Sequence, residues 1–61
     1  MKIEKELFLQ LRENATTTCG NAYLMDNGEI LNNKEYKALN LMGKLRMIMY
    51  YDYKTNNVIR V

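Results

Sequence analysis

The sequence predicts a single small α+β domain, in which a helix, a hairpin, a second helix and a second hairpin build a mainly antiparallel four-stranded sheet. The chain has 61 residues, of which 48% are hydrophobic and 26% charged, a composition typical of a folded domain. It contains no proline and no linker-like stretch. Two segments with helical spacing of apolar residues are each followed by short apolar runs around turn residues. We therefore expect one domain over residues 1–61.

The first segment, residues 2–14, is rich in Glu, Lys, Leu and Gln, which favour a helix. One stripe of that helix carries five apolar residues: Ile3, Leu7, Phe8, Leu11 and Ala15. A strand is the alternative, because alternate residues from Ile3 to Leu11 are also mostly apolar on one side. The helix leaves Leu9 exposed on its polar face. Residues 15–21, with three threonines and a glycine, predict a loop.

The middle of the chain carries two local signals. Short apolar runs flank Asp26–Gly28, where Asp and Asn suit a tight turn and Gly28 can adopt a positive φ, so we expect a hairpin. Asn32 and Glu35 have the spacing of a capping box, which predicts that a second helix begins there and ends at Gly43.

The last third is rich in Met, Ile and Tyr, which favour a strand over residues 44–53. Asp52 and Asn56 then predict a turn that leads into a final strand over residues 58–61. The alternative is one continuous helix from Lys34 to Tyr51, because four apolar residues also share a helical face: Ala38, Leu41, Leu45 and Ile48.

The chain has few groups for chemistry. It contains no histidine, no serine and one cysteine, so the usual catalytic triads, imidazole zinc sites and an intrachain disulfide are excluded. No phosphate-binding glycine motif occurs. Cys19, among threonines and a glycine, is predicted to be a small buried residue rather than a nucleophile. We expect a protein that is not an enzyme and uses no cofactor or metal.

Location follows from the same composition. The apolar runs are too short to cross a bilayer, and charges stand where a signal peptide needs an apolar stretch. We expect a cytoplasmic protein, of the producing or the host cell, with no membrane association. Eight asparagines and no proline resemble the composition of an accessory protein from an AT-rich bacterium or phage.

One stretch predicts a binding surface. On a strand, Leu45, Met47, Met49, Tyr51 and Tyr53 would face the core, and the intervening residues would face outward. Tyr, Met and Arg are enriched at protein interfaces. We therefore expect six partner-binding residues, five on this strip and one on the first helix: Lys44, Arg46, Ile48, Tyr50, Lys54 and Leu9.

Three functions are compatible with these features. A protein-binding regulator or inhibitor, acting on a host macromolecule, is preferred because the chain has more apolar residues than a small monomer easily hides. A nucleic-acid-binding protein is the alternative, through Lys44, Arg46, Tyr50, Lys54 and Arg60, although the net charge is only +2. The third is a homodimer that buries its surplus apolar surface.

Overall fold

The structure is a computed structural model that describes residues 2–60, and the side chains of residues 5–60. The described chain forms three helices and four strands in the order α1 (Lys2–Thr18), β1 (Ala22–Met25), β2 (Ile30–Asn32), α2 (Asn33–Lys37), α3 (Leu41–Lys44), β3 (Met47–Asp52) and β4 (Asn57–Arg60). The strands form one sheet in the order β2-β1-β3-β4, and all three pairings are antiparallel. The predicted α+β class and antiparallel four-stranded sheet are confirmed.

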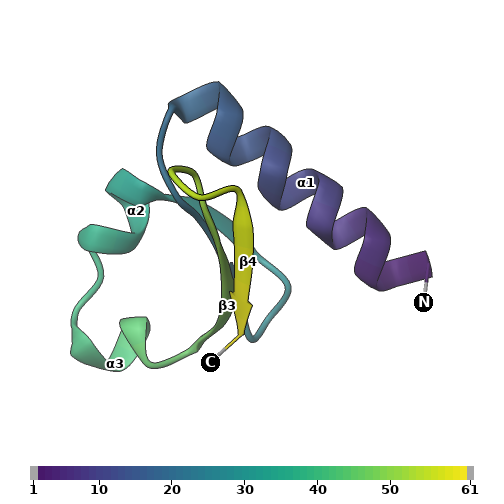
Figure 1. Cartoon of the computed structure of the whole chain (residues 1–61). Helices are drawn as coiled ribbons and strands as arrows, with labels where there is room; N and C mark the ends of the chain where they lie inside the picture. The colour runs from purple at the N-terminus through teal and green to yellow at the C-terminus, as the bar shows by residue number, and fades with distance from the viewer. Residues whose placement is uncertain (1, 61) are drawn as a thin grey trace.

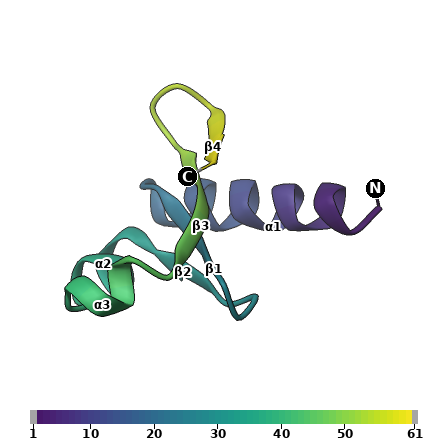
Figure 2. The same ribbon diagram turned by 90° about the horizontal axis from the view of Figure 1, so that it is seen from below.

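Helix α1 covers one face of the sheet and contributes part of the core (Figures 1 and 2). Leu11 and Ala15 are fully buried, together with Ala22 and Leu24 of β1 and Tyr51 of β3, and Leu7 packs against this cluster. The spacing of four residues from Leu7 to Ala15 puts these side chains on one stripe of the helix. The predicted stripe is therefore confirmed for these residues, while the side chain of Ile3 lies outside the described residues.

The end of α1 differs from expectation, because residues 15–18 are helical rather than a loop. The hydroxyl of Thr18 donates to the carbonyl of Asn14 at 2.9 Å, which satisfies a polar side chain within the last turn. The N–H of Gly20 donates to the carbonyl of Ala15 and that of Cys19 to Thr16, at 3.1 and 3.4 Å. These two bonds are those of a Schellman motif, and Cys19 has φ 53°. Cys19 is exposed, so its predicted burial is wrong.

Both predicted turns are present. After β1, the N–H of Gly28 donates to the carbonyl of Met25 at 3.0 Å, and Gly28 has φ 89°. After β3, the N–H of Asn56 donates to the carbonyl of Asp52 at 2.8 Å, and Asn56 has φ 58°. Strand β4 follows as predicted up to Arg60, and Val61 lies outside the described residues.

Two short helices replace the single helix that was expected to end at Gly43. The Asn32–Glu35 capping box is confirmed, since the side chain of each residue accepts the backbone N–H of the other at 2.7 and 3.0 Å. Helix α2 then ends at Lys37, and Asn40 caps α3 by accepting the N–H of Gly43 at 2.8 Å. The continuous helix to Tyr51 is not formed, because residues 47–52 are a strand.

The strand prediction for residues 44–53 is too long at both ends, because β3 spans Met47–Asp52. Tyr53 lies in the turn after β3 and is exposed, so its predicted place in the core is wrong. Lys44 ends α3 and Leu45 is its C-cap, so Leu45 is exposed instead of facing the core. Within β3, Tyr51 and Met49 face the core as predicted. Their partners on β1 are Ala22 and Leu24, and the register shifts beyond Leu24.

Helices α2 and α3 lie on the sheet face opposite α1 (Figure 1). Helix α1 therefore covers the first face of the sheet, and α2 and α3 cover the second face. On the second face, the half formed by β3 and β4 is more open. None of the helices between residues 2 and 60 has the length and apolar composition that a bilayer crossing requires.

Candidate functional site

The six predicted partner-binding residues are distributed over three elements and two connecting segments. Lys44 ends α3, Ile48 and Tyr50 lie on β3, and Lys54 lies in the β3–β4 turn, whereas Leu9 is exposed on α1. Arg46 precedes β3, and its Nε lies 3.1 Å from Oδ1 of Asp26, with both side chains exposed. Tyr50 is half-buried against Tyr23 rather than free on the surface. Their role in binding a partner stays a prediction.

A stack of three tyrosine rings connects α2 to the second face of the sheet. The ring of Tyr23 lies 3.9 Å from that of Tyr36 and 5.6 Å from that of Tyr50, centroid to centroid. The Tyr36 hydroxyl also donates to the carbonyl of Lys44 at 3.3 Å, which attaches the end of α3 to α2. Sequence reasoning missed this stack, because the stacking partners Tyr23 and Tyr36 stand thirteen residues apart and belong to a strand and a helix.

A chain of hydrogen bonds connects the loop after α1 to its three neighbours. The side-chain oxygen of Asn21 accepts the N–H of Tyr53 at 3.0 Å, and its amide nitrogen donates to the Tyr23 hydroxyl at 3.5 Å. The Tyr23 hydroxyl in turn donates to the side-chain oxygen of Asn33 at 3.0 Å. The end of α1, strand β1, helix α2 and the β3–β4 turn are therefore held in a fixed arrangement around one point.

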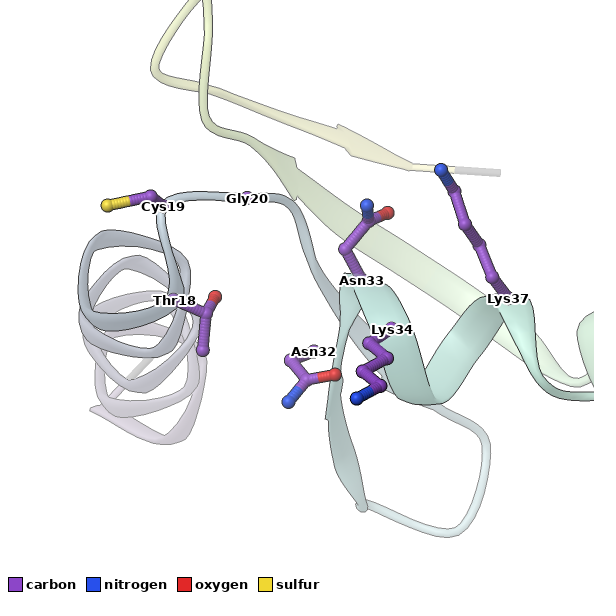
Figure 3. Close-up of a pocket in the computed structure, with 7 residues that line it drawn as sticks. All are labelled: Thr18, Cys19, Gly20, Asn32, Asn33, Lys34 and Lys37. Atoms are coloured by element: carbon purple, nitrogen blue, oxygen red, sulfur yellow. The ribbon is translucent and has the colours of Figure 1, made fainter.

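Two adjoining hollows, of about 510 and 420 Å³, lie around that point. Both are lined by Cys19, Gly20, Asn33 and Lys37; Lys34 also lines the first, and Tyr53 and Lys54 also line the second. We call the two together the basic hollow. Figure 3 shows the first of them, in which Asn33 and Lys37 extend from α2 to the same side and Lys34 extends the other way.

Tyr53 and Cys19 contact each other at the rim of the basic hollow. A hydrogen bond with the Cys19 side chain, the negative charge of its thiolate and a small loss of hydration together hold the pKa of the Tyr53 hydroxyl above its ordinary value. Both side chains are exposed. The pair is therefore a contact between the end of α1 and the β3–β4 turn, open to solvent.

A second surface is apolar. Leu41, Met42 and Leu45 are 72%, 73% and 70% exposed, and they lie within a single helical turn at α3. We call these three side chains the α3 ridge. Ile48, which is 45% exposed, follows three residues later at the start of β3.

Within the side chains that the structure describes, no group of three His, Cys, Asp or Glu residues could hold a metal ion. Comparisons of the chain with protein-family models, with curated proteins and with solved structures give no match.

Proposed function

We propose that this protein is a small protein-binding regulator or inhibitor, without catalysis of its own, that docks on its partner through the α3 ridge. The exposure of Leu41, Met42 and Leu45 carries the proposal, because three neighbouring large apolar side chains at about 70% exposure are costly to leave in water. Burying each of them in an apolar pocket of a partner stabilises the complex by about 1.5–3 kcal/mol before the cost of association. Occupying a partner's surface regulates that partner without any reacting group.

None of these three side chains is buried in the fold. Polar contacts hold helix α3 and the segment that follows it. Asn40 caps the helix, and the Tyr36 hydroxyl donates to the carbonyl of Lys44. Just after the helix, the N–H of Asp26 donates to the carbonyl of Arg46 at 2.8 Å. The backbone at Gly43 also lies close to the Leu39 side chain, since a Cβ on residue 43 would be 3.2 Å from the Cβ of Leu39. The apolar surface of the ridge therefore remains available for a partner.

The test compares partner capture by the full chain and by the double variant Leu41→Ser/Met42→Ser. Because both residues are exposed, we expect the variant to keep its free energy of unfolding within about 0.5 kcal/mol. Each truncation removes a buried contact from the complex, so the dissociation constant of the purified pair should rise by at least about tenfold. Isothermal titration calorimetry measures that constant, and circular dichroism with urea measures the stability.

Leu9→Ser tests the competing surface, because it removes the exposed leucine of α1 that the sequence also predicts to bind a partner, on the other side of the sheet. Because the α3 ridge is the proposed docking surface, this variant is the control. It should leave the dissociation constant unchanged. Loss of capture in Leu9→Ser together with normal capture by the double variant would move the binding surface to α1 and overturn the proposal. A dimer of the chain alone, detected by sedimentation over a dilution series and dissolved by the double variant, would assign the ridge to self-association.

A further inference from the structure

The positive charge of this protein is concentrated at the basic hollow. Three lysines line it, Lys34, Lys37 and Lys54, with one carboxylate, Asp52. The whole chain has nine Lys and Arg against seven Asp and Glu, so the other six basic and six acidic residues balance one another. The net charge of +2 is therefore that of the hollow.

The single carboxylate at the hollow, that of Asp52, accepts hydrogen bonds from two residues of its own turn. Oδ1 of Asp52 accepts the N–H of Lys54 at 3.2 Å, and Oδ2 accepts the hydroxyl of Thr55 at 3.0 Å. Among the described side chains, no carboxylate lies within ion-pair distance of the three lysine ammonium groups. Lys37 and Lys54, which both line the second hollow, therefore project an uncompensated positive field into a concave space that attracts an anion.

Asn33 supplies an oriented donor beside these charges. Its side-chain oxygen accepts the Tyr23 hydroxyl at 3.0 Å, and Tyr23 is buried and stacked on Tyr36. With the oxygen held there, the amide NH₂ group points away from Tyr23. Figure 3 shows the Asn33 side chain on the same side of α2 as Lys37. An amide and an ammonium group on one side of a hollow are donors that suit the oxygens of a phosphate.

The other wall carries an aromatic ring. Tyr53 lines the second hollow beside Lys54, is 38% exposed, and is anchored through its backbone N–H to Asn21. An exposed tyrosine next to lysines is the arrangement on which a nucleobase stacks while its phosphate is neutralised. Each hollow also has a volume within the range of small-molecule sites, about 300–1,000 Å³.

We infer that the basic hollow binds a nucleotide, with the phosphate held by Lys37, Lys54 and the Asn33 amide, and the base stacked on Tyr53. The site is separate from the α3 ridge and goes beyond the proposed function. The nucleotide is either a free mononucleotide or one unit of a single-stranded nucleic acid, since both present the same phosphate and base.

The test is an NMR titration of the ¹⁵N-labelled full chain with adenosine 5′-monophosphate, adenosine and inorganic phosphate at low salt. The monophosphate should shift the amides of Gly20, Asn33, Lys37 and Lys54, and inorganic phosphate should shift the same amides less. Adenosine should bind at least about tenfold more weakly, because it lacks the charge that the lysines attract. Equal binding of adenosine and its monophosphate, or shifts scattered away from the hollow, would overturn the inference.

Two variants that each remove one positive charge distinguish a specific phosphate site from a general electrostatic attraction of the anion to the protein. Lys37→Gln should weaken binding of the monophosphate by about three- to tenfold. Arg12→Gln changes an exposed residue of α1 and should alter this binding by less than about twofold. Equal losses in the two variants would contradict a specific site. Tyr53→Ala should weaken binding of the monophosphate by about tenfold and leave inorganic phosphate unaffected.

A single-stranded hexanucleotide distinguishes the two sources. Binding more than about tenfold tighter than the monophosphate indicates that the chain holds several units of a strand, each neutralised phosphate adding to the affinity. Binding no tighter than the monophosphate indicates a free nucleotide. Failure of both ligands to bind overturns this inference and leaves the α3 ridge proposal to its own test.

Discussion

The rings of Tyr23 and Tyr36 lie face to face, with centroids 3.9 Å apart and planes 8° apart, and this contact joins α2 to the sheet. We expect Tyr36→Leu to lower the free energy of unfolding by about 1–2 kcal/mol, because it removes both the ring stack and the hydroxyl bond to Lys44. Tyr36→Phe keeps the ring and should lower it by only about 0.5–1 kcal/mol. Urea denaturation measures both, and equal losses in the two variants would show that the stack contributes nothing.

The cap at Asn40 is expected to fix α3, and hence the direction of the ridge. Asn40→Ala removes the acceptor for the Gly43 N–H, so stability should fall by about 1 kcal/mol. Hydrogen exchange at the Gly43 amide should become faster, because that N–H loses its partner. Asn40→Asp retains an acceptor at the same place and should keep both values near those of the unchanged chain; slow exchange in Asn40→Ala would argue against this role of the cap.

The local signals of the sequence were reliable where a short polar pattern fixes the backbone. The turn at Asp26–Gly28, the turn after Asp52 and the capping box at Asn32 and Glu35 all depend on side chains that bond to backbone groups within a few residues. Such interactions need no tertiary partner, so a single sequence predicts them. They also placed the strands of the sheet to within a few residues.

The predictions failed where local preferences compete. Asn40 can sit inside a helix or cap one, and it caps α3, which splits the expected helix and leaves Leu45 exposed beyond its end. The threonines at 16–18 favour a loop by composition, yet the packing of Ala15 against the sheet carries α1 through them. The basic hollow was also missed. Two of the lysines that line it, Lys37 in α2 and Lys54 in the β3–β4 turn, are far apart in the sequence and come together only in the folded chain.

Cys19 occupies a position in the helix C-terminus that normally suits glycine. With φ 53°, its side chain crowds the backbone, which costs about 1–2 kcal/mol for a residue with a Cβ. Cys19→Gly relieves this crowding, which stabilises the folded chain, but it also increases the conformational entropy of the unfolded chain, which offsets part of the gain. Because alanine keeps the crowding, we expect Cys19→Gly to be about 1 kcal/mol more stable than Cys19→Ala. Urea midpoints measure the difference.

Thr17→Gly is the matched control for that comparison, because it places glycine inside the last turn of α1 on an exposed residue. There the backbone is helical, and glycine should lower the stability by about 0.3–0.5 kcal/mol relative to threonine. A Cys19→Ala variant as stable as Cys19→Gly would mean that the left-handed conformation at residue 19 carries no strain.

The contact between Cys19 and Tyr53 predicts a dependence of stability on alkaline pH. The hydrogen bond with Cys19 and the charge of its thiolate raise the pKa of Tyr53 in the folded chain above its unfolded value. A raised pKa means that the folded state prefers the neutral phenol, so this contribution is complete below the unfolded pKa and is lost as the pH rises through the folded one. Stability should therefore fall above the ordinary tyrosine pKa, and only modestly, since both groups are exposed.

Two substitutions at Cys19 separate the causes. Cys19→Ala removes the hydrogen bond and the thiolate together, so the pKa of Tyr53 should return toward its ordinary value and the alkaline loss of stability should shrink. Cys19→Ser retains a hydrogen-bonding group without a nearby charge, and its Tyr53 pKa should lie between the other two. Carbon-13 NMR of the tyrosine Cζ atoms follows Tyr53 apart from the other four tyrosines. An unchanged pKa in Cys19→Ala would mean that the end of α1 and the β3–β4 turn do not meet at this pair in solution, and the wall of the basic hollow would have to be placed differently.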